Sequence, residues 1–563
     1  MFINYFKILV ILFLLFFQSP LYSKNDDNNY FYSKNLSEYF SAITSYDNGE
    51  NTKSLVFFNK SKALINKHDP YLKKYLFSLV EEGKISWAIK ELKKNQNKEN
   101  SNFFEAHLLL MLDSIENQDF EKSNKYMNKL LDTVNNDTYK LLIFESLKKY
   151  NYLFQNKSIL KEKSSFDNFS NIIKAFENCY IGNPNKTTSS FLNLINQPDI
   201  DYSRYIFFYV NYLSKQKKFK RAEEVVSQVE ELNSSLLIYQ TKDWVKKKEF
   251  VNFDKIFSCQ SELDILSEFF FLISNLYSSQ QNFNKSNFYL NLSIFLNPKF
   301  KFNFSLMAEN YYSEGDYARS KRILNSFTPK DGIYYWYKIK KKADIILQKE
   351  NSISSFIYLN SNFKKIKKPT TKIIFDMANL TKNFKKYKVA IKYYNKVLKN
   401  IDSNSEIYAD VLFRRGGSYE RIKEFERSDQ DLIASLKINP DNAYVLNYLA
   451  YSWLERSYKI DEAIKMLEKA YEIKSNDPFI LDSVGWAFYL TKDFDKAENF
   501  LRRAIQLMPD DPIVNDHYGD ILWKLNRKIE AKYYWKSVLN FEDTEEAMKK
   551  NINDKILKGL EKI

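Results

Sequence analysis

Histidine, the side chain that most often performs acid–base catalysis, occurs only three times in the 563 residues. His68, His107 and His517 are scattered along the chain, so a histidine-based triad or a multi-histidine metal site has almost no material. The sequence also contains no phosphate-binding GxxxxGK motif, no GxGxxG, no CxxC and no HExxH. The common nucleotide, metal and hydrolase signatures are therefore absent.

The remaining candidates for acid–base chemistry are pairs of aspartates near the C-terminus. Asp510 with Asp511 and Asp516 with Asp520 are expected to cap helices rather than to catalyse a reaction. For His517, which lies beside Asp516, we expect a partly buried packing role. The sequence thus predicts a protein that is not an enzyme and has no cofactor, no metal ion and no catalytic residue.

Glycine and proline are also scarce, with 10 and 11 residues, which leaves little material for β-turns or long flexible linkers. The charged fraction of 28% suits solvated helix faces, and the chain is too long for one hydrophobic core. We therefore expect an all-α protein made of several domains or of a repeat array.

A sequence repeat favours the repeat array over several separate domains. Small residues of the first helix recur at Gly416, Ala450, Gly485 and Gly519. Those of the second helix fall at Ser428, Ala463, Ala497 and Ala531, and one repeat earlier the pair is Ala378 and Ala390. The period of about 34 residues is that of the tetratricopeptide repeat (TPR), in which small residues let two antiparallel helices approach closely. One helix pair cannot bury its apolar face alone, so the sequence predicts a superhelical solenoid of stacked TPR-like pairs.

The clarity of the repeat divides the chain. Residues 371–545 form the clear array, residues 24–370 form degenerate TPR-like repeats, and residues 546–563 read as a polar C-terminal capping helix. The small pairs Ala42/Ser54, Ser274/Ser286 and Ala308/Ser320 carry the pattern upstream. Between Asn136 and Pro198, and between Leu236 and Glu262, helical periodicity continues without a clean repeat.

Residues 1–23 have the layout of a secretory signal peptide. Lys7 precedes an apolar run from Ile8 to Phe17, followed by Pro20 and a small residue, Ser23, before a polar segment. The alternative is an uncleaved anchor, which would make the protein a membrane-anchored assembly factor, although the run is shorter than the roughly 20 residues that cross a bilayer. No cysteine follows the run for lipid attachment. We expect an exported protein, in the periplasm or cell envelope, held at the membrane only peripherally or by an uncleaved segment.

Cys179 and Cys259 are the only cysteines. In an oxidising compartment they could pair. They lie more than two repeats apart in the sequence, however, and stacked repeats contact only their neighbours. Buried free thiols are therefore the expectation.

A net charge of +15 raises the alternative of a basic helical-repeat protein that binds nucleic acid. The lysines are spread along the array, which favours a solvated surface and no nucleic-acid partner. The densest basic patches, Lys338 to Asp344 and Phe363 to Pro369, are the surfaces to test for an acidic partner.

Tryptophan is concentrated in the last repeats, at Trp453, Trp486, Trp523 and Trp535. The first helices of a TPR array line a concave groove that binds peptides, and exposed tryptophans there would be good anchors for a partner. Packing between helices is the alternative for each of them.

The segments LNYLAYSWLER, LDSVGWAFYL and HYGDILWKLNRKIEAKYYW resemble those of proteobacterial envelope TPR proteins, a group that includes the lipoprotein adaptor of a carboxy-terminal processing protease. The resemblance is strongest between residues 409 and 540. It implies a non-enzymatic scaffold that binds protein partners, with a periplasmic protease and its substrates as the sharper expectation. Ala450, Leu490 and the missing lipidated cysteine depart from the relative, and no binding residue carries over.

Overall fold

A computed structural model describes residues 27–65, 67–95, 98–162, 165–197, 203–542 and 544–560. Within these ranges the chain forms thirty α-helices, three short 3₁₀ helices and no strand. The predicted fold class, an all-α solenoid of helix pairs, is confirmed. The predicted signal peptide lies outside the described residues. No helix in the described part of the chain is both long and apolar enough to cross a bilayer.

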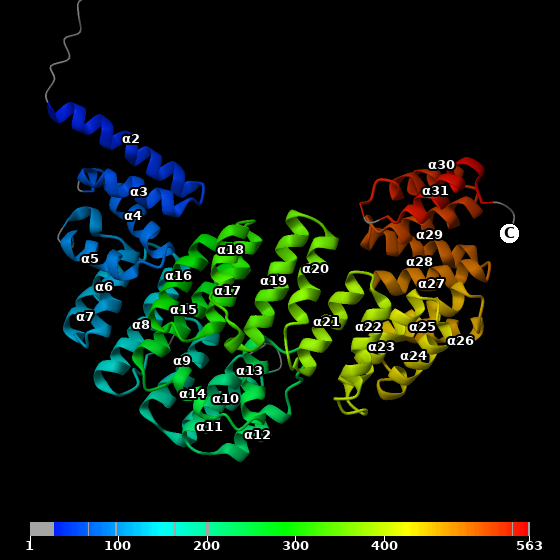
Figure 1. Ribbon diagram of the computed structural model, residues 1–563, viewed down its shortest axis with the longest axis horizontal. Coiled ribbons are helices and arrows are strands. Elements are labelled where there is room, and N and C mark those ends of the chain that lie inside the picture. The colour runs from blue at the N-terminus through cyan, green and yellow to red at the C-terminus, as the bar shows by residue number, and fades with distance from the viewer. Residues whose placement is uncertain are drawn as a thin grey trace, which may run out of the picture. The chain divides into compact units, whose positions relative to one another are not determined.

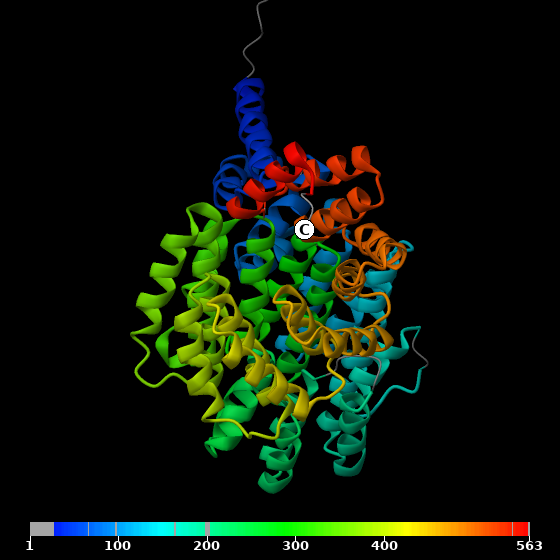
Figure 2. The same ribbon diagram turned by 90° about the vertical axis from the view of Figure 1, so that its right-hand side faces the viewer.

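The chain forms two compact units, coloured blue to green and green to red in Figure 1 and Figure 2. Unit 1 comprises residues 1–229 and 234–338, and unit 2 comprises residues 230–233 and 339–563. The division falls within α19, whereas the sequence placed the change of repeat quality at residue 370.

The helices of unit 1 are α2 (Asp27–Asp47), α3 (Asn51–Lys60), α4 (Asp69–Glu81), α5 (Ile85–Asn95), α6 (Phe104–Glu116), α7 (Phe120–Asp132), α8 (Thr138–Asn156), α9 (Asp167–Ile181), α10 (Pro184–Ile195), α11 (Tyr205–Lys215), α12 (Phe219–Ser227), α13 (Leu236–Lys246), α14 (Val251–Ile256), α15 (Glu262–Ser279), α16 (Phe283–Leu296), α17 (Lys301–Ser313), α18 (Tyr317–Leu324) and the start of α19 (Ile333–Lys349). Short 3₁₀ helices span Lys62–Leu64, Glu99–Ser101 and Pro329–Asp331. The helices of unit 2 are the rest of α19, α20 (Ser352–Phe363), α21 (Thr371–Asn383), α22 (Tyr387–Leu398), α23 (Glu406–Arg421), α24 (Phe425–Ile438), α25 (Ala443–Glu455), α26 (Ile460–Ile473), α27 (Pro478–Leu490), α28 (Phe494–Leu507), α29 (Pro512–Lys524), α30 (Lys528–Val538) and α31 (Glu546–Lys558).

A serine hydrogen bond explains why the small residues of unit 1 stand twelve apart. The buried hydroxyl of Ser54 donates to the carbonyl of Ala42 at 2.9 Å. The same bond joins Ser286 to Ser274 at 2.7 Å and Ser320 to Ala308 at 2.9 Å. A helix with a bulky residue at this point could not approach close enough to share its carbonyl. The twelve-residue pairs therefore mark the crossing point of each helix pair.

The later helices of unit 1 pack against its earlier ones. The rings of Phe77 on α4 and Phe288 on α16 lie 4.8 Å apart, and those of Tyr150 on α8 and Phe269 on α15 lie 6.0 Å apart. Figure 1 shows α15 beside α8 accordingly. Stacked repeats in this unit thus contact more than their sequence neighbours.

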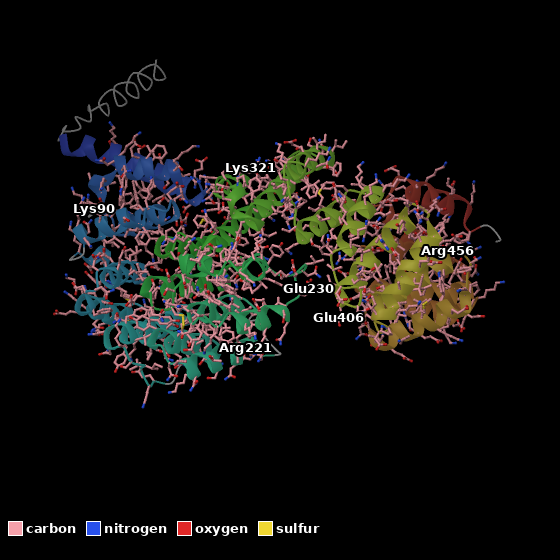
Figure 3. The ribbon with its side chains drawn as sticks, turned by 60° about the horizontal axis from the view of Figure 1, so that its bottom comes forward. Lys90, Arg221, Glu230, Lys321, Glu406 and Arg456 are labelled. Atoms are coloured by element: carbon pink, nitrogen blue, oxygen red, sulfur yellow. A yellow bond between two sulfur atoms is a disulfide. The ribbon has the colours of Figure 1, made fainter. Side chains whose placement is uncertain are left out.

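The two cysteines are brought together by this packing of later helices against earlier ones. Cys179 near the end of α9 and Cys259 before α15 form a disulfide with their Cα atoms 5.8 Å apart, seen as the yellow bond in Figure 3. Tyr180 donates to Glu262 beside it at 2.6 Å. The expectation of free thiols is therefore wrong, because it assumed that only neighbouring repeats touch. The start of α15 lies against α9, although 80 residues separate the cysteines.

Unit 2 consists of regular helix pairs stacked in chain order, coloured from yellow-green to red in Figure 2. Gly485 and Gly519 make the closest approaches between helices. A Cβ added at Gly485 would lie 2.6 Å from Leu501, and one at Gly519 would lie 2.4 Å from the indole of Trp535. The two glycines are therefore required by space rather than by backbone angle.

The helix starts follow local rules. Asp477 and Asp511 cap α27 and α29 by accepting hydrogen bonds from backbone N–H groups, and a proline follows each cap. Asp511 thus has the capping role that the sequence predicts. The last helix, α31, begins at Glu546, where the capping segment was expected.

Candidate protein-binding surface

The first helices of successive pairs in unit 2 place equivalent residues side by side. Tyr451, Trp486 and Asp520 each stand one residue after the small residue of their helix, on α25, α27 and α29. The half-buried Trp486 donates its Nε1–H to Glu455 at 2.9 Å. Its ring stacks on Tyr489 at 4.7 Å and on the imidazole of His517 at 4.1 Å. The rings of Tyr489, Trp486 and His517 therefore form an aromatic row across α27 and α29.

His517, a member of that row, also joins α29 to α27 through an ion pair. Its Nδ1 lies 3.0 Å from both carboxylate oxygens of Asp482, and both side chains are buried. Burial alone would lower the pKa of His517, but the carboxylates of Asp482, Asp516 and Asp520 outweigh it and raise that pKa above its ordinary value. His517 is thus a buried ion-pair partner, which agrees with the packing role expected for it.

The next acidic pair receives a cation from α31. The ammonium of Lys555 lies 2.6 Å from Asp516 and 2.8 Å from Asp520. Burial and the neighbouring Asp516 carboxylate raise the pKa of Asp520 to about 6. The two aspartates therefore fasten the last helix and do not cap one, so that part of the expectation is wrong. Asp482 with His517 and Asp516 with Lys555 form a ladder of ion pairs between successive first helices.

The four predicted tryptophans separate into two kinds. Trp535 is completely buried, where its Nε1–H donates to Asp520 at 3.0 Å, and Trp453 is only 5% exposed. Both pack between helices and offer no surface to a partner. Trp523 is half-buried with its ring 5.4 Å from that of Trp535, and Trp486 is half-buried in the aromatic row. Of the four, Trp486 and Trp523 alone keep surface that a partner could contact.

The predicted repeat-packing residues all lie buried in the helix pairs of unit 2: Ala378, Ala390, Gly416, Ser428, Ala450, Ala463, Gly485, Ala497, Gly519 and Ala531.

A row of exposed apolar side chains escaped the sequence reasoning. Tyr444, Phe479 and Ile513 are 46%, 54% and 46% exposed, at the first turns of α25, α27 and α29. Each stands six residues before the small residue of its helix, so aligning the repeats could have found them. Ile473 and Leu507, which end the preceding helices α26 and α28, are also exposed. We call Tyr444, Phe479 and Ile513 the apolar row.

The described residues contain no group of three or more histidine, cysteine, aspartate or glutamate side chains able to hold a metal ion. Some lysines of the predicted basic patches form ion pairs within the chain. Lys340 pairs with Asp376 at 2.7 Å and Lys341 with Asp344 at 3.6 Å.

No family model matches the chain. The TPR repeat-containing protein PA4667 of Pseudomonas aeruginosa is 33% identical over 111 residues, which are 20% of this chain and 19% of that protein. The chain thus spans about a fifth of the length of this relative. The similarity supports the assignment of the repeats.

Solved TPR structures resemble parts of the chain. A Parabacteroides merdae TPR protein is 14% identical with a TM-score of 0.38, and the match covers 45% of this chain and 97% of that one. A thermophilic TPR protein of Thermus thermophilus is 15% identical with a TM-score of 0.30, and the match covers 33% of this chain and all of that one.

Proposed function

We propose that the chain is a non-enzymatic scaffold that binds protein partners at the cell envelope. The exposed apolar row carries this proposal, because an apolar side chain recurs at the same exposed position of the first helices of three successive pairs, which also carry the aromatic row. Aromatic and apolar side chains in such a cluster are the usual anchors of protein interfaces. The TPR assignment supports the same class of function.

The test replaces the apolar row with serine and compares partner capture. The variant Y444S/F479S/I513S removes three half-exposed apolar groups, so it should fold while losing partners crosslinked in intact cells. The matched control is I529S/Y533S on α30, whose side chains are 89% and 68% exposed outside the row. Equal capture by both variants, with unchanged helicity, would refute the assignment of the binding face.

Export to an oxidising compartment is the second part of the proposal. The disulfide between Cys179 and Cys259 supports it, since such bonds persist in the periplasm and are rare in the cytosol. The layout of residues 1–23 supports it as well. Mass measurement of the chain taken from cells, alkylated with and without prior reduction, tests both points at once. Two free thiols on an uncut chain would contradict export.

The resemblance to envelope TPR adaptors makes a periplasmic protease the first client to test. Crosslinks from a photoreactive residue at position 479 should then include a protease, and crosslinks from position 533 should not. If only other envelope proteins are crosslinked, the scaffold function stands and the protease is not its client.

A further inference from the structure

Four cations gather where the first helices of unit 2 begin their stack. Lys382 lies in the last turn of α21, Arg414 and Arg421 lie on α23, and Lys385 lies in the turn after α21. Arg414 pairs with Asp410 at 2.9 Å, and Arg421 lies 3.6 Å from Glu420. The half-buried ammonium of Lys382 forms no hydrogen bond or ion pair with any residue that the structure describes. The cluster therefore holds more cations than its neighbouring anions balance.

The surroundings of Lys382 disfavour its charge. Burial lowers its pKa first, and Arg414 and Arg421 lower it further, while Asp410 offsets them only in part. An anionic group placed among the three cations would relieve both effects. A partner with acidic side chains is the chemistry that fits.

The chain itself supplies an example of such a group. The connection between α30 and α31 reads Phe-Glu-Asp-Thr-Glu-Glu over residues 541–546, and its Glu545 pairs with Lys385 at 2.7 Å. A hydrogen bond from Lys385 and then the charges of Lys385 and Arg421 lower the pKa of Glu545. The side chains of Lys385 and Glu545 are 69% and 64% exposed, so water screens their ion pair and a ligand can displace it.

We propose that Lys382, Arg414 and Arg421 form a binding site for an acidic segment of a protein partner, and that the connection between α30 and α31 competes for this site through Glu545. The site lies on the same unit as the apolar row, so one partner chain can present apolar anchors to the row and acidic side chains to the cations. The proposal rests on the scaffold function given above and specifies the chemistry of the client.

The experiment measures binding of a fluorescein-labelled probe to the full chain by anisotropy at low salt. The probe is two tandem copies of Phe-Glu-Asp-Thr-Glu-Glu, and the control probe has glutamine and asparagine at the acidic positions. We expect the acidic probe to bind about 10-fold more tightly than the control probe, with an affinity that falls as salt is added.

Three variants of the chain separate the site from general charge. K382M should weaken binding of the acidic probe about 10-fold, whereas K392M, which removes an exposed lysine from α22, should not. E545Q should tighten binding about 2-fold to 5-fold, a gain that misfolding cannot produce.

Equal binding of the two probes would overturn the proposal, and so would an unchanged affinity in both K382M and E545Q. If the acidic probe fails to bind while position 479 still crosslinks to partners, the acidic-segment site is wrong and the scaffold function stands.

Discussion

Adding one methyl group at Gly519 should loosen the last repeats of unit 2. The Cβ of an alanine would lie 2.4 Å from Nε1 and 2.5 Å from Cδ1 of Trp535, and 3.2 Å from the backbone oxygen of Ala531. The ring is completely buried and donates to Asp520, so it cannot move without straining its neighbours and that hydrogen bond. Overpacking costs about 1–3 kcal/mol, and a hydrogen bond to a charged group adds about 1.5–3 kcal/mol if it breaks. Alanine returns about 1 kcal/mol of helix propensity, which leaves a net loss of about 2 kcal/mol.

The matched control is G417A on α23. A Cβ there would meet only the side chain of Tyr448, whose hydroxyl would be nearest at 3.4 Å, which is an ordinary contact. The helix propensity gain of about 1 kcal/mol should then appear as added stability.

Hydrogen exchange read by mass spectrometry resolves the two effects, because a repeat array need not unfold as one unit. In G519A, protection of α29 and α30 should fall about 30-fold, which corresponds to about 2 kcal/mol. In G417A, protection of α23 should stay equal or rise. A G519A chain as protected as the original would refute the view that these glycines exist to admit the facing side chain.

Three further predictions concern covalent and ionic links. C179S should cost unit 1 about 2–5 kcal/mol, because it opens the 80-residue loop to Cys259, and the thermal midpoint of the original chain should fall likewise on reduction. The folded-state pKa of His517 is raised, so its ion pair with Asp482 should contribute fully to the free energy of unfolding below about pH 6.5. This contribution should be lost as the pH rises through the raised pKa. Urea unfolding of D482N across this pH range should show a much smaller change of stability with pH. K555M should cost about 3–5 kcal/mol by leaving buried carboxylates uncompensated, and exchange in α31 should show the loss first.

The pairing of helices could be read from the sequence because it depends on local spacing. Two small residues twelve apart mark one crossing point, and the carbonyl of Ala42 accepting from Ser54 shows why the spacing holds even where the repeat is degenerate. Such contacts join two helices across the short connection between them, so the spacing of the residues can be recognised in a single sequence. The all-α class followed from these pairs.

The packing of the later helices of unit 1 against its earlier ones could not be predicted from the sequence in the same way. It depends on contacts such as Phe77 with Phe288, which no local spacing constrains. The pairing of Cys179 with Cys259 follows from that packing and was missed for the same reason. A rule that only neighbouring repeats touch holds for regular arrays, and unit 1 departs from regularity in its middle helices.

The burial of Trp535 could have been predicted from the sequence. Gly416, Gly485 and Gly519 each face the residue sixteen positions later, which is Leu432, Leu501 and Trp535. Two leucines at this position identify it as core, and the tryptophan is the third member of the set. Comparing repeats position by position separates core aromatics from surface ones, whereas counting tryptophans in the last repeats does not.

The ladder of ion pairs also limits what unit 2 can recognise. Asp482 and Asp516 lie buried on the first helices, yet His517 and Lys555 already neutralise them, so these carboxylates cannot select a basic partner without breaking the stack. The exposed apolar row and the cations around Lys382 take no part in this ladder, so they remain available to a partner. Specificity in unit 2 should therefore come from apolar anchors and from acidic residues of the partner, although the same helices are rich in aspartate.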